Sequence, residues 1–129
     1  MKLHLQNAPE LYLIGAIEAA ADGRPAAVLV RGERWSEAVV LQARAAPAAW
    51  LVADWGGLTE AHFEALLALQ PDVVLVGTGA RQRFAHPRLY ASLTAAQVGV
   101  DFMDTPAACR TYNILAGEDR AVVAALFVE

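Results

Sequence analysis

The chain has 129 residues and a mass of 13.8 kDa, which fits one domain spanning residues 1–129 and leaves little room for a second. Hydrophobic residues make up 57 % of the chain and charged residues 19 %, a composition that excludes intrinsic disorder. The net charge of −4 and the isoelectric point of about 5.3 argue against a protein that coats nucleic acid, because such proteins are normally basic.

The mean hydropathy of +0.34 raises the question of a membrane segment. The longest uncharged run covers residues 89–100, which is shorter than the roughly 20 apolar residues of a membrane-spanning helix, so no integral membrane segment is expected. Residues 1–6 lack the apolar stretch of a secretory signal, and we expect a cytoplasmic protein. The single cysteine, Cys109, excludes an intrachain disulfide and a thiolate metal cluster.

The first half of the chain predicts strands. Apolar runs at residues 11–17, 26–30 and 35–41 have the length and composition of strands, and the last two flank a hairpin loop at Gly32-Glu33. Residues 42–57 show no clear periodicity and predict a long irregular segment.

The second half predicts alternating helices and strands. Thr59 is a good helix N-cap, and the Thr105-Pro106 pair predicts a second helix start with Thr105 as the N-cap. The expected helices cover residues 59–70, 87–99 and 105–117, and the expected strands cover residues 73–76, 100–103 and 121–128. This alternation predicts an α/β fold with largely buried strands, to which the first half adds an antiparallel hairpin unit.

Ligands of open α/β sheets bind beyond the carboxyl ends of the strands, where the loops at residues 77–84 and 103–110 would meet. Gly77-Thr78-Gly79 follows a predicted strand, as in dinucleotide-binding loops. However, Gln82 stands at the position of the third glycine and the next helix starts only near Pro87. These departures favour a tight turn with positive φ over a nucleotide site.

Arginines gather in the same loops. Arg81, Arg83 and Arg88 lie in a stretch without acidic residues, and Arg110 lies one turn into the predicted third helix. Guanidinium groups beside a helix N-terminus suit phosphate or carboxylate, and a solvated loop whose arginines pair with surface acids fits the sequence equally well.

Four further residues of the third helix and its start have two interpretations each. Cys109, beside Arg110 and near the helix start, resembles an activated thiol, but a small buried side chain is favoured. Asp104 and Thr105 offer an acid and a nucleophile, but helix capping explains them better. Asn113, on the face of Cys109, either faces water or makes a specific hydrogen bond.

No catalytic constellation is complete, and no cofactor is expected. His4, His62 and His86 share no helical spacing and have no cysteine pair beside them, so no metal site is expected. The candidate anion or ligand crevice comprises ten residues: Gly77, Thr78, Gly79, Arg81, Arg83, Asp104, Thr105, Cys109, Arg110 and Asn113.

Two sequence blocks carry a family resemblance. Residues 71–79 (PDVVLVGTG), then Met103-Asp104-Thr105 and residues 107–116 (AACRTYNILA), resemble a family of small domains of unknown function. A eukaryotic relative of this family is mitochondrial complex I assembly factor 3. The resemblance extends from about Trp35 to Val128 and implies a three-layer fold, with a mixed central sheet between helices, and no established catalytic residue.

The same resemblance implies a role in assembling a respiratory complex through protein partners. The first residues do not resemble a mitochondrial targeting segment, and we expect a bacterial protein. The preferred hypothesis is a non-enzymatic binding or assembly protein, with a protein partner or self-association through the apolar, tryptophan-containing residues 45–55. The alternative is a small-anion-binding protein or enzyme that uses the crevice above.

Overall fold

The strands form two sheets in a computed structural model that describes residues 10–129. A five-stranded mixed sheet has the order β5-β4-β8-β6-β7, and a three-stranded antiparallel sheet has the order β1-β2-β3. In chain order the strands are β1 (Ile14–Glu18), β2 (Ala27–Val30), β3 (Glu33–Trp35), β4 (Val39–Gln42), β5 (Ala45–Ala49), β6 (Val73–Thr78), β7 (Gly99–Met103) and β8 (Val122–Phe127). Strand β6 is parallel to β7 and β8, whereas β4 is antiparallel to β8. The expected mixed sheet and N-terminal antiparallel unit are confirmed.

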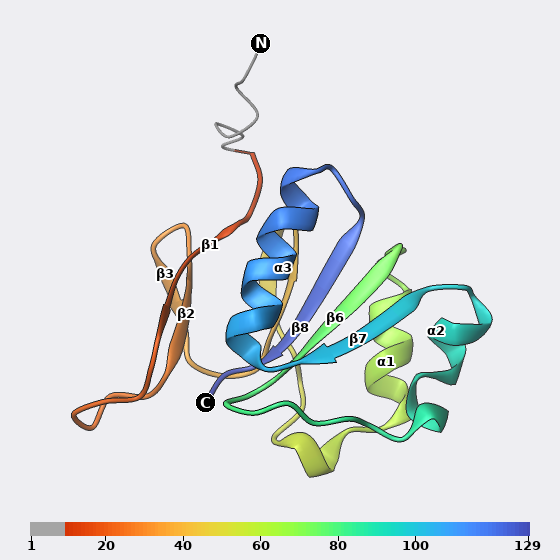
Figure 1. Ribbon diagram of the computed structural model, residues 1–129, viewed down its shortest axis with the longest axis horizontal. Helices are drawn as coiled ribbons and strands as arrows, with labels where there is room; N and C mark the ends of the chain where they lie inside the picture. The colour runs from red at the N-terminus through yellow and green to blue at the C-terminus, as the bar shows by residue number, and fades with distance from the viewer. Residues whose placement is uncertain (1–9) are drawn as a thin grey trace.

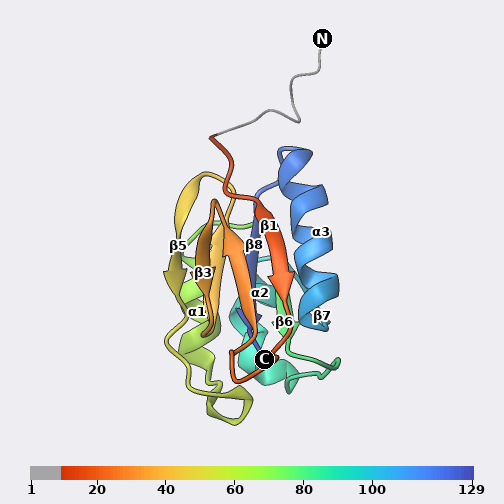
Figure 2. The same ribbon diagram turned by 90° about the vertical axis from the view of Figure 1, so that its left-hand side faces the viewer.

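The helices complete three layers. They are α1 (Glu60–Leu67), α2 (Ala91–Ala95) and α3 (Thr105–Gly117), with short 3-10 turns η2 (Trp55–Gly57) and η3 (Pro87–Tyr90). Helices α1 and α2 cover one face of the large sheet, and α3 covers the other (Figure 1). The small sheet lies beside α3 on that second face (Figure 2).

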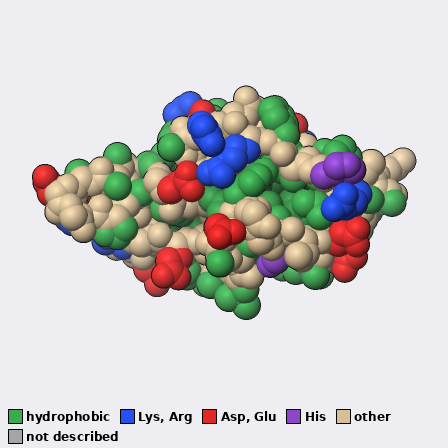
Figure 3. All heavy atoms as spheres, turned by 90° about the horizontal axis from the view of Figure 1, so that it is seen from below, with side chains coloured by type: hydrophobic (Ala, Val, Ile, Leu, Met, Phe, Trp, Pro, Cys, Tyr) green, Lys and Arg blue, Asp and Glu red, His purple; other side chains and the backbone are tan. Residues whose placement is uncertain are grey.

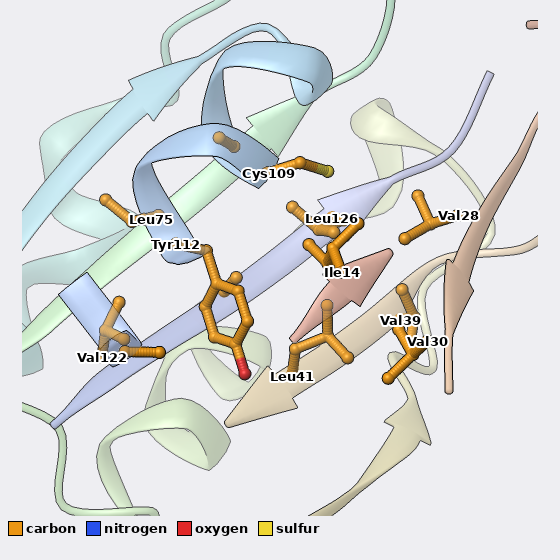
Figure 4. Close-up of a cluster of buried hydrophobic side chains, with 13 residues drawn as sticks. Ile14, Val28, Val30, Val39, Leu41, Leu75, Cys109, Tyr112, Val122 and Leu126 are labelled. Carbon is orange, nitrogen blue, oxygen red and sulfur yellow. The ribbon is translucent and has the colours of Figure 1, made fainter. Parts of the chain in front are cut away.

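Strand β8 lies in the middle of the large sheet and is buried along its whole length. Val122, Ala124 and Leu126 belong to the hydrophobic cluster under α3 and the small sheet (Figure 4). The alternate residues Val123, Ala125 and Phe127 belong to the cluster under α1 and α2. Because successive strand residues point to opposite faces, one apolar strand supplies both cores.

The predicted strand at residues 35–41 is two strands of different sheets. Trp35 pairs with Val28 in the small sheet, and Val39 pairs with Leu126 in the large one, so the chain crosses between sheets at residues 36–38. The hairpin loop is Arg31-Gly32 instead of Gly32-Glu33, and its two residues have φ values of 51° and 81°. Positive φ at both positions is the type I′ geometry that matches the strand twist.

The segment at residues 42–57 is also more regular than predicted. It contains β5, the edge strand that pairs with β4, and the 3-10 turn η2. Strand β5 has the sequence Ala-Ala-Pro-Ala-Ala and so lacks the β-branched and aromatic residues that signal a strand. Its extended form depends on pairing with β4, which local sequence does not reveal.

Two helix boundaries differ from the predictions. The helix expected at residues 87–99 is a 3-10 turn followed by the short α2, and Gly99 is the first residue of β7. The left-handed residue after α2 is Gln97, with φ of 63°. The N-cap of α3 is Asp104 instead of Thr105, because the Asp104 carboxylate accepts a 2.8 Å hydrogen bond from the Ala107 N–H.

Helix α3 is joined to the small sheet by side chains of adjacent residues. The Asn113 amide accepts from the Ile14 N–H and donates to the Ile14 carbonyl, both at 2.8 Å. The Tyr112 hydroxyl donates to the Tyr12 carbonyl at 2.7 Å. Asn113 therefore has the specific hydrogen bonds that were one of its two expected roles, and it pairs with an edge strand as another strand would.

Replacing Asn113 with Ala removes both hydrogen bonds to Ile14, a residue only 7 % exposed. We expect the free energy of unfolding to fall by about 1–3 kcal/mol, the usual cost of leaving buried polar groups unpaired. Urea denaturation measures this loss. The neighbouring Ile114→Ala is the control, because Ile114 is 60 % exposed and should change stability by no more than about 0.5 kcal/mol. Equal stability of the two variants would contradict the role of Asn113.

Candidate functional site

The carboxyl ends of β6, β7 and β8 meet at one end of the molecule, here named the carboxyl edge. Figure 3 looks onto this end and shows blue arginine side chains beside red carboxylates, around exposed hydrophobic atoms. The loop after β6 and the start of α3 meet here as predicted.

Thr105 connects three segments at the carboxyl edge. Its hydroxyl donates to the Phe127 carbonyl at 2.5 Å and accepts from the Gly79 N–H at 2.8 Å. The Thr105 N–H in turn donates to the Gly79 carbonyl at 2.8 Å. The side chain is 4 % exposed and its hydrogen-bonding capacity is in use, so the arrangement suits a structural role better than nucleophilic attack.

Thr78 holds the following loop in the same way. Its hydroxyl lies 2.6 Å from the Arg81 carbonyl and 3.2 Å from the Met103 carbonyl, and it accepts from the Arg83 N–H at 3.1 Å. Thr78 is fully buried. The side chain fixes residues 79–83 against β7 and leaves no free hydroxyl for a ligand.

Gly77 is required for packing. A Cβ at this position would lie 2.7 Å from Leu126 Cδ2, which is closer than real Cβ contacts, and 3.0 Å from Thr105 Oγ1, which is tighter than most of them. Gly79 has φ of +97°, which favours glycine for conformational reasons. Both positions fit the tight turn that the sequence favoured over a nucleotide loop.

The ten residues of the predicted crevice occupy different surroundings. Gly77, Thr78, Gly79 and Thr105 meet in the interior, and Arg83 lies over them, half-buried. Asp104 caps α3, while Arg81 and Arg110 are exposed. Cys109 joins the core between α3 and the small sheet (Figure 4). Asn113 binds the backbone of Ile14 in the small sheet.

Cys109 is a core residue, 1 % exposed. Burial raises the pKa of its thiol from an ordinary value of 9.0 to about 12, and the opposing influence of the Arg110 charge is smaller. The thiolate is the nucleophilic form of cysteine, so the interior suppresses this chemistry at neutral pH. Burial raises the pKa of Tyr112 for the same reason.

A carboxylate that the sequence did not single out lies beside Arg83. Glu129 Oε1 is 3.1 Å from Arg83 Nη2, and the Arg83 guanidinium carbon lies 5.5 Å from the centre of the Trp55 ring. The sequence signal for this pair is weak, because a glutamate after an apolar strand usually faces solvent. For Arg83 this contact is the pairing with a surface acid that was one of the two alternatives for the loop arginines.

A second site lies between β5 and α1 and includes residues 48–51 of the segment 45–55 that was predicted to meet a partner. Here an apolar groove of about 310 Å³ has ten lining residues: Val40, Ala48, Ala49, Trp50, Leu51, Ala61, His62, Ala65, Leu66 and Leu69. Leu51 is 84 % exposed and Leu69 is 37 % exposed. The His62 ring fixes this rim, accepting from the Thr59 N–H at 2.9 Å and lying 3.0 Å from the Leu51 carbonyl.

Neither a metal cluster nor a spanning helix is found in residues 10–129. No group of three or more His, Cys, Asp and Glu side chains there has the geometry to hold a metal ion, and His4 lies outside the described residues. Among the same residues, no helix is long and apolar enough to cross a membrane.

Residues 22–127 match the family model described as protein of unknown function (DUF498/DUF598). The chain belongs to this family. The matched segment includes both sequence blocks that carried the resemblance. The predicted resemblance to this family and to assembly factor 3 is therefore confirmed. Of the elements in the described residues 10–129, this segment contains β2 to β8 and the helices, and β1 lies before it.

Two solved structures match nearly the whole length of this chain. A crystal structure from Bordetella parapertussis has a TM-score of 0.82 and 37 % identity, covering 95 % of this chain and 99 % of that one. A solution structure from Bordetella pertussis, described as an Mth938-like domain, has a TM-score of 0.79 and 33 % identity, covering 99 % and 92 %.

Curated relatives match a shorter part of this chain. Mouse NADH dehydrogenase (ubiquinone) 1 alpha subcomplex assembly factor 3 is 35 % identical over 79 residues, which are 60 % of this chain and 43 % of the relative. The 13 kDa major membrane protein of Francisella tularensis is 35 % identical over 69 residues, which are 54 % of this chain and 56 % of the relative. The chain therefore spans about half the length of the curated relatives it matches.

The burial of Cys109 predicts its reactivity. Raising the pKa from 9.0 to about 12 lowers the thiolate fraction at neutral pH about a thousandfold, so iodoacetamide should alkylate the native protein at least that much more slowly than free cysteine. In 8 M urea, used to expose the thiol, alkylation should proceed at the rate of free cysteine. Mass spectrometry of timed samples measures both rates, and rapid native labelling would contradict the buried placement.

The packing of Gly77 predicts a difference between two glycines. Gly77→Ala should lower the free energy of unfolding by about 1–3 kcal/mol, because its Cβ overlaps Leu126 and Thr105. Gly117→Ala is the matched control, since no atom lies within 4 Å of a Cβ at the last residue of α3, and it should be neutral or slightly stabilising. Thermal unfolding followed by circular dichroism compares them. If both alanine variants unfold at one temperature, close packing at Gly77 is not required.

Proposed function

We propose that this protein is a non-enzymatic protein-binding domain that takes part in assembling a larger complex, with respiratory complex I as the candidate. Support for the complex comes from the assembly factor 3 relatives, which share 60 % of this chain at about 35 % identity. The observation that carries a binding role is the apolar groove between β5 and α1, with Leu51 at its rim.

The groove has the chemistry of a docking surface. Alanines at positions 48, 49, 61 and 65 give it a shallow floor, and a partner backbone can approach such small side chains closely. Burying a leucine as exposed as Leu51 contributes about 1.5–3 kcal/mol. A contiguous apolar surface of this kind is typical of a protein interface.

The edge strand indicates how the partner binds. Strand β5 is an unpaired edge of the large sheet and carries Pro47 at its centre. Proline has no N–H and interrupts main-chain pairing, which protects the edge from strand addition. We therefore expect recognition through side chains, with an amphipathic segment of the partner protein placing apolar residues in the groove.

The surroundings of the candidate nucleophiles and of the groove histidine favour binding over catalysis. The hydroxyls of Thr78 and Thr105 are engaged in internal hydrogen bonds, and Cys109 is buried in the core. The groove itself is lined by apolar side chains apart from His62, whose two ring nitrogens contact Thr59 and Leu51. A site built this way can bind a partner but offers no free nucleophile or base.

Leu51→Asp tests the proposal. In the organism of origin, deletion of the gene should reduce assembled complex I on native gels, and the wild-type gene should restore it. The Leu51→Asp variant should restore less than about a tenth, because a buried unpaired carboxylate opposes docking. Both Leu51 and the control Ile114 are exposed, so each variant should fold, as circular dichroism checks.

Ile114→Asp is the control, since it places the same charge on an exposed apolar position of α3. It should restore complex I fully. Normal complex I in the deletion strain would contradict the assembly role, and full restoration by Leu51→Asp would contradict the groove. Sedimentation of the purified protein tests whether a second copy of this chain fills the groove instead of another protein. A dimer that the Leu51→Asp substitution abolishes would show such self-association.

A further inference from the structure

Arg83 differs from the other arginines of its loop. Its N–H is held by Thr78, its guanidinium lies 5.5 Å from the Trp55 ring centre, and its side chain is only 27 % exposed. Arg81, two residues earlier, is exposed, and among residues 10–129 no ion pair fixes its guanidinium. The protein therefore holds one guanidinium in a defined position at the carboxyl edge.

The surface beside Arg83 accommodates a carboxylate group. Glu129 Oε1 lies 3.1 Å from Arg83 Nη2 and 3.5 Å from the Ala80 backbone nitrogen. Its carboxyl carbon and Oε1 would both be 2.5 Å from a Cβ at position 79, so only glycine permits this approach. Gly79, the Ala80 N–H and Arg83 together form what we name the carboxylate site.

Glu129 uses only part of this site. Arg83 Nε is buried and has no hydrogen-bond partner in the described structure. Nε and Nη2 are the two donors on one side of a guanidinium, and a carboxylate placed squarely against them accepts from both. The single contact of Glu129 leaves one donor unpaired, which is unfavourable for a buried group.

Glu129 is also weakly held. It follows the last paired residue of β8, Phe127, by two positions, and its side chain is 51 % exposed. An exposed ion pair shifts an equilibrium by no more than about fivefold. A carboxylate from outside that pairs with both Nε and Nη2 therefore has more favourable contacts than the one it replaces.

We propose that the carboxylate site binds a carboxylate ligand, the side chain of an acidic residue in a partner segment or a free small carboxylate, and that Glu129 is an internal competitor for it. When the ligand binds, the Glu129 side chain moves into solvent and the two donors of Arg83 pair with the two oxygens of the ligand. Glu129 thus raises the ligand concentration needed for binding, because the ligand binds only the fraction of molecules in which Glu129 has left the site. The proposal does not depend on the apolar groove.

Removing the competitor tests this idea on the full chain. The probes are acetate, the blocked peptide acetyl-Ala-Glu-Ala-amide, and inorganic phosphate as a tetrahedral comparison. Binding is followed by NMR through the indole N–H of Trp55 and the Nε–H of Arg83. Glu129→Gln should bind acetate and the peptide about two- to sixfold more tightly than the wild type, because the competing charge is gone.

Variants of the arginines locate the site. Arg83→Gln should abolish probe binding, and Arg83→Lys should weaken it despite keeping the charge, because lysine lacks the paired donors. Arg81→Gln is the matched control in the same loop and should bind as the wild type does. Leu51→Asp should also bind normally, which separates this proposal from the groove.

The binding results decide whether the carboxylate comes from an acidic segment or from a small molecule, and they can overturn the proposal. Tighter binding of the peptide than of acetate identifies an acidic segment as the ligand, and equal binding identifies a small carboxylate. If Glu129→Gln binds neither probe more tightly than the wild type, Glu129 is a structural tether and the proposal fails. It also fails if phosphate binds as tightly as the carboxylates, or if Arg83→Lys, with wild-type chemical-shift dispersion, binds unchanged.

Discussion

The structure depends on β8 being buried on both faces. Its six residues contribute alternately to the cluster under α3 and to the cluster under α1 and α2, so each layer packs on the same strand. Ala124 and Ala125 stand at its centre and are completely buried, which allows both layers to lie close to the sheet. Backbone pairing with β4 and β6 satisfies the polar groups that this burial removes from water.

The geometry of the carboxyl edge follows from where β8 ends. The Phe127 carbonyl accepts from Thr105 and so fixes the start of α3, while Glu129, two residues later, is carried over Gly79. Gly77 leaves room for the Leu126 side chain and for Thr105, so the start of α3 lies close against β6. The carboxylate site is thus formed where a central strand leaves the core and its next charged residue meets the loop of its neighbour.

The small sheet depends on α3 in a different way. A sheet of three short strands needs a buried apolar face to be stable, and this one buries Ile14, Val28 and Val30 against the common core. Asn113 and Tyr112 then bind the backbone of Ile14 and Tyr12, which replaces hydrogen bonds that an edge strand would make with water. The apolar groove lies at the β5 edge of the large sheet, between β5 and α1.

The elements that could be predicted are those in which local chemistry and tertiary burial agree. The apolar runs of β6 and β8, the capping residue Thr59 and the proline at the start of α3 each carry their signal within a few residues. Strand β5 carried none, because alanines and Pro47 become extended only by pairing with β4. The crossing between β3 and β4 was missed for the same reason, since residues 35–41 read as one strand until their partners are known.

The sequence by itself determined the α/β class, the buried strands, the turn at Gly77–Gly79 and the family. It also placed arginines near the carboxyl edge and an apolar segment at residues 45–55. Only the tertiary structure decided that Cys109 is in the core, that Asn113 binds Ile14, and that Glu129 lies against Arg83. The last two pairs are separated by 99 and 46 positions, and their contacts depend on strand order and register. Periodicity and spacing report which face of an element a residue occupies, whereas packing decides which distant residue it meets there.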